Sequence, residues 1–211
     1  WSFSVTPTLT PKASLTRSVL INEIAWAGTL SSLTDDEWIE LYNPGSVSIN
    51  ITGWTIKASD GEPNITLIGT IPARGYFLLE RGTTVIDNTT VSDVPADQIY
   101  TGNVLSNSGE TLKLYDGSNK IIDTANNNGG SWPKGSSSTY GSMERIGNST
   151  EGDSSWKTNT GSQKNGLNAN GGAILGTPRK ANSASSSPTL TASIPTRITT
   201  STPNFIPPVG R

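Results

Sequence analysis

Two stretches decide the class of fold: VLINEIAWA at 19–27 and EWIELYN at 37–43. Each is short and dominated by β-branched, aromatic and other apolar residues, a composition that favours strands. In the second stretch Ile39 and Leu41 fall on one face of an extended backbone, and Glu40 falls on the other. The pattern therefore predicts two neighbouring strands of a sheet.

The region between these stretches and Asn182 continues in the same style, and it contains no convincing helix pattern, because Gly, Asn, Ser and Thr interrupt it too often. Further strands are predicted at 47–51, 53–57, 65–70, 75–81, 99–100, 111–116, 120–125, 143–146 and around Trp156. The first two of these are expected to pair around Thr52-Gly53. The runs at 111–116 and 120–125 are expected to form a hairpin across Gly117-Ser118-Asn119. Roughly eight or nine short strands indicate an all-β, immunoglobulin-like two-sheet β-sandwich.

The composition excludes several kinds of chemistry. The chain has no His and no Cys, so it has no Ser-His-Asp triad, thiol nucleophile, disulfide or His-ligated zinc. A net charge of −2 argues against a nucleic-acid partner, and no apolar run approaches the roughly 20 residues of a membrane span. The one easy enzyme interpretation, a two-carboxylate glycosidase, needs only a pair of acids, which 17 acids provide by chance. We predict a non-enzymatic protein with no cofactor.

Charge and composition divide the chain into a central domain at 19–182 and two terminal arms at 1–18 and 183–211. Both arms are rich in Ser, Thr and Pro and contain no acid, whereas all 17 acids lie in the central domain. One interpretation is that the arms are flexible linkers. The other is that they are strands without a partner, because their apolar residues alternate with polar ones at Trp1, Phe3 and Val5, and at Leu190, Ala192 and Ile194, followed by a second apolar pair at Phe205 and Ile206.

A sandwich has open sheet edges to which a strand of another chain can add. The arms therefore predict self-assembly with other copies of the same protein, in which each arm adds a strand to a neighbouring subunit. A head-to-tail contact of this kind that does not close on itself makes a filament. The rival interpretation, in which each arm folds back on its own domain, stays open.

Several motifs resemble the lamin-tail domain family, in the order in which they occur there. The segments at 19–26, 37–43 and 51–56 are similar to its opening strands, those at 75–80 and 112–116 to later strands, and 142–146, Trp156 and 176–178 to the end of the bacterial versions. The resemblance covers about 19–181 and leaves the arms outside. It implies an immunoglobulin-like sandwich that acts as a non-catalytic module of a secreted or cell-surface protein, and it brings no catalytic residues.

The densest acidic cluster is a candidate calcium site, formed by Asp35, Asp36, Glu37 and Glu40. No EF-hand spacing is present, so a solvated loop that leads into a strand explains the same residues. Glu23 is expected to lie near Glu40 on the adjacent strand, where it joins such a site or pairs with Arg145 or Lys57.

Two loop aromatics, Trp132 and Tyr140, are candidates for contact with a glycan, because they lie in a Gly/Asn/Ser-rich segment. They support an alternative function, a glycan- or protein-binding accessory module of a larger surface protein. The competing interpretation is a loop Trp that folds back to plug one end of the sandwich. The other four Trp residues after the N-terminal arm lie in strand-like contexts and are expected to be core or half-buried: Trp26, Trp38, Trp54 and Trp156.

Four Asn-x-Ser/Thr sequons are candidates for glycosylation of a secreted protein, at Asn50, Asn64, Asn88 and Asn148. A chain this rich in Asn, Ser and Thr also produces such sequons by chance. The sequence as a whole predicts an extracellular, non-enzymatic structural protein that assembles through its arms.

Overall fold

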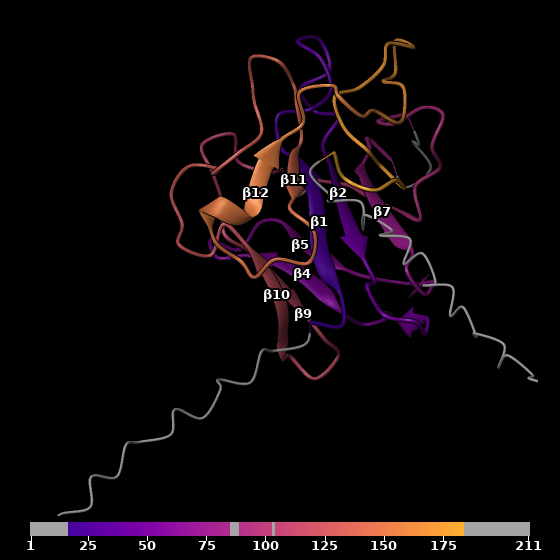
Figure 1. Ribbon diagram of the computed structural model, residues 1–211, viewed down its shortest axis with the longest axis vertical. Helices are drawn as coiled ribbons and strands as arrows, with labels where there is room; N and C mark the ends of the chain where they lie inside the picture. The colour runs from indigo at the N-terminus through magenta and orange to yellow at the C-terminus, as the bar shows by residue number, and fades with distance from the viewer. Residues whose placement is uncertain (1–16, 85–88, 103, 184–211) are drawn as a thin grey trace, which may run out of the picture.

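Strands β1 (Leu20–Ala25) and β2 (Trp38–Tyr42) lie side by side at the centre of a six-stranded sheet in the computed structural model of the chain (Figure 1). The sheet order is β12-β11-β1-β2-β7-β8, and its pairs are antiparallel except for β7 and β8, which are parallel. The other four strands are β7 (Tyr76–Arg81), β8 (Gln98–Tyr100), β11 (Met143–Arg145) and β12 (Trp156–Thr158).

The structure describes residues 17–84, 89–102 and 104–183. The assembly residues that the sequence predicts in both arms lie outside these ranges, as does one sequon: Trp1, Phe3, Val5, Leu190, Ala192, Ile194, Phe205, Ile206 and Asn88. Within the described ranges the one helical element is a 3-10 turn at Asp153–Ser155. No helix in these ranges is long and apolar enough to cross a membrane.

A second, four-stranded sheet has the order β10-β9-β4-β5. Its strands are β4 (Thr55–Ala58), β5 (Asn64–Thr66), β9 (Leu112–Tyr115) and β10 (Ile121–Ala125). The predicted β9–β10 hairpin is confirmed: Asn119 takes a positive φ of 64° and donates its backbone N–H to Asp116. A small two-stranded sheet pairs β3 (Ile49–Asn50) with β6 (Thr70–Ile71).

Two details of the predicted strand pairing are wrong. The segments at 47–51 and 53–57 do not pair with each other, because Gly53 turns the chain at φ 84° and carries it from β3 into the other sheet. β3 pairs with β6, whereas β4 pairs with β5 and β9. The predicted strand at 65–70 is two strands, β5 and β6, separated by Gly69 at φ 145°.

The main core lies between the six-stranded and four-stranded sheets, which confirms the all-β sandwich. The six-stranded sheet contributes Ile21, Ile39, Leu41, Phe77 and Leu79. The four-stranded sheet contributes Ile56, Leu112, Leu114 and Ala125. Burial of these side chains removes apolar surface from water, which is the dominant favourable term in folding.

The Trp residues in strand-like contexts behave as predicted. Trp26, Trp38 and Trp156 are buried, and Trp54 is partly buried against the main core. Trp38 does not belong to the main core, however. It lies on the opposite face of its sheet, in a second apolar cluster with Ala25, Leu78, Val91, Val94 and Ile174.

The six-stranded sheet is therefore covered on both faces. One face packs on the four-stranded sheet, and the other is covered by chain segments around 91–94 and 174–183. All six residues of β1 are buried as a result. A strand buried on both faces loses the simple alternation of apolar and polar residues, and it must place its polar side chains in contact with partners.

Candidate functional site

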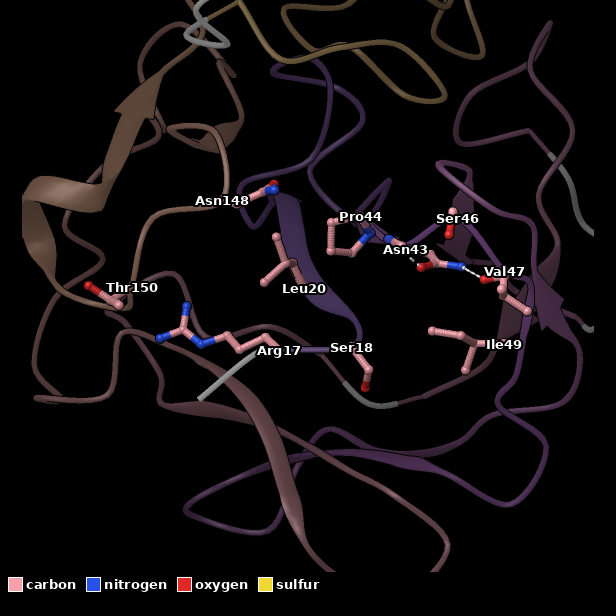
Figure 2. A pocket seen from close by; sticks show the side chains of 11 residues that line it. Arg17, Ser18, Leu20, Asn43, Pro44, Ser46, Val47, Ile49, Asn148 and Thr150 are labelled. Carbon is pink, nitrogen blue, oxygen red and sulfur yellow. Dashed lines mark hydrogen bonds between the residues drawn. The ribbon is translucent and has the colours of Figure 1, made fainter. Parts of the chain in front are cut away.

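A pocket of about 590 Å³ opens beside the first described residue, Arg17 (Figure 2). It lies between the start of β1, the turn that follows β2 and the loop around 148–150. Pockets of this size fall within the range of about 300–1,000 Å³ that is usual for ligand sites. Its lining residues are Arg17, Ser18, Leu20, Asn43, Pro44, Gly45, Ser46, Val47, Ile49, Asn148 and Thr150.

The wall of the pocket formed by residues 43–47 is held in shape by Asn43. Its amide nitrogen Nδ2 donates to the backbone oxygens of Val47 at 2.8 Å and Pro72 at 3.0 Å, and its Oδ1 accepts the N–H of Gly45 at 2.9 Å. These bonds fix the turn, yet they leave the Val47 side chain 72% exposed. The wall is therefore preformed, and its apolar part comes from Pro44 and Val47, with Ile49 also in the lining.

On the side of β10, a fully buried ion pair joins the two sheets. Arg145 Nη2 lies 2.7 Å from Asp123 Oδ2, and both side chains are inaccessible to solvent. Arg145 also donates through Nε to the Ile21 oxygen at 2.7 Å and through Nη2 to the Thr124 oxygen at 2.9 Å. Its guanidinium lies 4.3 Å from the ring centre of Trp156. Burial raises the pKa of Asp123 and lowers that of Arg145, although each charge favours the other.

Arg17 extends this clamp to the rim of the pocket. Its Nε lies 3.1 Å from Asp123 Oδ1, and its Nη1 donates to the Ser149 oxygen at 2.9 Å. Asp123 therefore holds two guanidinium groups, one from the rim and one from the core. The pocket is bordered by a guanidinium that shares one carboxylate with Arg145, so the three side chains together keep one net positive charge.

Three buried glutamates form a cluster on the second face of the six-stranded sheet. Glu23 in β1 lies opposite Glu40 in β2 and Glu144 in β11 in the strand registers. All three are fully buried. The expected nearness of Glu23 and Glu40 is confirmed. Hydrogen-bond donors from the covering segments and from neighbouring strands meet these carboxylates: Asn22, Ser142, Asn159, Thr177, Arg179 and Ser183.

The Thr177 hydroxyl joins two carboxyl groups of this cluster. The Thr177 hydroxyl oxygen lies 2.8 Å from Glu23 Oε2 and 2.9 Å from Glu144 Oε1. A hydroxyl has one hydrogen, so it donates fully to only one of the two carboxyl groups. Burial, with the charge of Glu144, raises the pKa of Glu23 to about 8. Burial, with the charge of Glu23, raises the pKa of Glu40 well above its ordinary value.

The four acids predicted as a calcium site do not converge, although Asp35 and Glu37 both lie beside Arg81 Nη1. Asp35 has an 86% exposed side chain, whose Oδ1 lies 3.1 Å from Arg81 Nη1. Glu37 is buried and accepts the N–H of Leu105 at 2.9 Å, and burial raises its pKa to about 8. Glu40 belongs to the buried glutamate cluster. The residues alternate between faces along β2 and its approach, so nearness in sequence does not make them converge.

Two further sequence expectations about these acids need correction. Glu23 pairs with neither Arg145 nor Lys57, because Arg145 points into the core toward Asp123 while Glu23 faces the covering segment. Among the described residues, no group of three or more His, Cys, Asp or Glu has a geometry that could hold a metal ion.

Trp132 does not present its ring to solvent. The prediction that it contacts a glycan assumes an exposed ring, and this assumption is wrong. The side chain is 8% exposed and stacks on Trp26, with ring centres 6.2 Å apart and planes at 11°. Its indole N–H donates to the Ser106 oxygen at 2.7 Å. Tyr140 is partly buried against the same core. The competing interpretation, a loop Trp folded back onto the sandwich, describes what the structure shows.

Three of the four sequon asparagines, Asn50, Asn64 and Asn148, lie at exposed positions. Asn148 also lines the pocket beside Arg17. Accessibility is a condition for modification, and these three positions meet it. Their glycosylation stays a prediction.

Sequence reasoning missed the pocket and the third member of the glutamate cluster. The pocket is built from segments far apart in the chain, such as Leu20, Ile49 and Thr150, and no local pattern joins them. A signal for the cluster existed in Glu144, which lies in a short strand between Met143 and Arg145.

The part of the chain that contains the opening strands matches a known protein family. A family model for the lamin tail domain matches residues 12–129, which is more than half of the chain. The motifs at 142–146, 156 and 176–178 lie beyond the matched residues. A comparison with curated proteins gave no significant match. With its immunoglobulin-like sandwich, the chain belongs to the lamin tail domain family, whose domain serves in protein interaction or structure.

Proposed function

We propose that the chain is a non-catalytic structural protein, secreted or displayed on the cell surface, that assembles with copies of itself. In this proposal each terminal arm adds a strand to a neighbouring subunit, and repeated head-to-tail contacts build a filament. The coarser part of this function, an immunoglobulin-like domain for interaction or structure, follows from the family.

The observation that carries the proposal is that the outer strands of the sheets have an unpaired edge within the described residues. Both sheets end in strands that pair on one side within the described residues: β12 and β8 in one sheet, β10 and β5 in the other. Gln98 bridges β5 and β8, since its side chain donates to the Thr66 oxygen and accepts the N–H of Ile68. Arg145 covers part of β10 through the Thr124 oxygen. Among the described residues β12 pairs only with β11, and β3 pairs only with β6, so both strands offer an open edge to an added strand.

The positions of the buried charges support a non-catalytic role. Glu23, Glu40 and Glu144 are inaccessible to a substrate, and their oxygens accept bonds that hold the covering segment. Among the described residues that line the main pocket, the ionisable one is Arg17, which is paired with Asp123. An acid–base mechanism needs a titratable group within hydrogen-bond reach of a bound substrate.

Location outside the cell is part of the same proposal. It is supported by the resemblance to bacterial lamin-tail modules of surface proteins and by the exposed sequon asparagines at 50, 64 and 148. Fractionation of the source cells tests it directly. Recovery of the protein in the cytoplasm alone would contradict it.

A second candidate, a binding module for another protein, is favoured by the preformed apolar pocket beside Arg17. The glycan-binding version of this candidate has lost its aromatic platform, because Trp132 is buried. The two candidates differ in the state of the purified protein. A binding module stays dispersed, whereas a self-assembling protein forms oligomers or filaments.

Deletion of residues 1–11 tests the proposed assembly. We expect the full chain to form particles larger than a monomer in multi-angle light scattering and filaments in electron micrographs. The truncated chain should be monomeric with an unchanged circular dichroism spectrum, because the described core starts after residue 17. Equal assembly of the two chains would show that the N-terminal arm is not the donor.

A further inference from the structure

We propose that the pocket beside Arg17 is the seat for residues 1–6 of a second copy of this chain. The inference rests on the proposed function and deepens it, because it names both the donor segment and the acceptor surface. In the assembled state the apolar side chains of the donor, Trp1, Phe3 and Val5, occupy the pocket.

The chemistry of the pocket matches the donor. Its apolar wall comes from Leu20, Pro44, Val47 and Ile49, and Arg17 at the rim is held by the Asp123 carboxylate. The segment WSFSVT at 1–6 has no charged side chain and places three apolar residues on one face of an extended backbone. Covering the 72% exposed side chain of Val47 removes apolar surface from water, at about 25 cal/mol per Å² buried.

A strand edge lies beside the pocket. β3 contains the lining residue Ile49 and pairs with β6 on one side, and no second strand pairs with it among the described residues. An extended segment in the pocket can therefore bond to the backbone of β3 while its side chains enter the apolar hollow. This combination of main-chain bonds and alternate side-chain pockets is how strand addition obtains affinity and specificity.

The length and composition of the arm favour a second copy over the same one. Arg17 lines the pocket and is anchored by Asp123 and the Ser149 oxygen. Residues 7–16 span at most about 35 Å when extended. Docking of residues 1–6 in the same subunit needs these ten residues to reverse direction, and Pro7 and Pro11 favour extended backbone instead. The same ten residues bridge to an adjacent subunit without a reversal.

The absence of cysteine from the chain makes a direct test available. One tagged copy of the full chain carries Phe3→Cys, and a differently tagged copy carries Val47→Cys. The matched control is Val104→Cys, because Val104 is also an exposed valine, at 49%. The next residue, Leu105, donates its N–H to Glu37, at the opposite end of β2 from Asn43. After mixing and mild oxidation, we expect a disulfide-linked dimer with Val47→Cys at a yield at least about tenfold above that with Val104→Cys.

Three outcomes would overturn the inference. Equal yields at positions 47 and 104 would mean that the contact is non-specific. A disulfide that forms within one chain carrying both Phe3→Cys and Val47→Cys, with none between copies, would mean that the arm docks on its own domain. A disulfide with neither acceptor, in a protein that still assembles, would move the acceptor elsewhere and leave the proposed function standing.

A second measurement separates failure of the pocket from failure of the proposed function. Val47→Asp places a charge in the apolar wall, and Val104→Asp places the same charge at the control position. We expect the first variant to reduce the assembled fraction in sedimentation at least about tenfold, and the second to leave it unchanged. Equal assembly of Val47→Asp and the unaltered chain would refute the pocket, whereas a monomeric unaltered chain would refute self-assembly itself.

Discussion

Glu23 shows how a single residue can carry a structural role that its type does not suggest. It sits in the central strand of a sheet that is covered on both faces, so its carboxyl is removed from water. Its two oxygens accept bonds from Ser142, from the Thr177 N–H at 2.9 Å and from the Thr177 hydroxyl at 2.8 Å. The group is satisfied as a hydrogen-bonding residue, and its raised pKa shows that a negative charge there is costly.

Stability should therefore fall as pH rises between about 5 and 8. In the unfolded chain Glu23 loses its proton near its ordinary pKa of 4.5, whereas the folded state keeps that proton up to about 8. In this window the unfolded state binds fewer protons, so the free energy of unfolding decreases with pH, by up to about 1.4 kcal/mol per pH unit for one such group. Glu37, also raised to about 8, adds a slope of the same sign.

Glu23→Gln should make this slope shallower, because the amide does not titrate and can still donate to Thr177. Urea unfolding at pH 5, 6, 7 and 8 measures the effect. The exposed Glu62 provides a control as Glu62→Gln, which should leave the slope as it is. Identical slopes for the Glu23 variant and the unaltered chain would mean that this carboxyl does not hold the proton.

At the scale of elements, the segment at 174–183 covers one face of a sheet without being a strand itself. It forms no strand in the assigned sheets, yet it covers the second face of the six-stranded sheet through Ile174 and through bonds to the buried glutamates. Asn182, near the end of this segment, donates through Nδ2 to the backbone oxygens of Asn22 at 3.0 Å and Arg145 at 2.9 Å. The covering segment is thus fastened to both β1 and β11.

Asn182→Ala should loosen the covering segment without unfolding the sandwich. The change leaves two buried backbone oxygens without these donors, which costs about 1–3 kcal/mol. Hydrogen–deuterium exchange should rise at residues 177–183 before it rises in β2, since local opening precedes global unfolding. The exposed Asn170 serves as the control in Asn170→Ala. Uniform exchange changes throughout the domain would contradict a local role for Asn182.

At the scale of the whole molecule, the folding unit extends beyond the residues that match the family. The match ends at 129, but Arg145 closes the buried ion pair with Asp123, Trp156 is part of the main core, and Thr177 bridges two glutamates. Removal of one partner of a buried ion pair typically costs 3–5 kcal/mol, by order of magnitude about as much as a small domain's margin. The C-terminal part is therefore structural, not an appendage.

Two fragments test whether the residues after 129 are needed for folding. A fragment of residues 17–183 should unfold cooperatively with a midpoint within a few degrees of the full chain, because the described core and bonds lie inside it. A fragment of residues 17–129 should lack a cooperative thermal transition in circular dichroism and calorimetry. Cooperative unfolding of the shorter fragment at a similar midpoint would show that β11, β12 and the covering segment contribute little.

The residue pattern alone predicts the all-β class, the central pair of strands, the β9–β10 hairpin and the burial of the strand tryptophans. These features depend on periodicity and turn residues, which are local properties of the chain. Three other features depend on the packing of distant segments: Trp132 is buried on Trp26, Glu37 and Glu40 have different partners, and β3 and β4 belong to different sheets.

The physical reason for this division is the distance along the chain between interacting groups. Strand formation follows from neighbouring residues, whereas the Glu23 cluster joins positions 23, 40, 144 and 177, and the pocket joins positions 17, 49 and 150. Because successive side chains of a strand point to opposite faces of the sheet, the sequence shows which side chains share a face. Only the packed structure shows that a second layer covers the other face, and it is this layer that removes the carboxyl groups of the cluster from water.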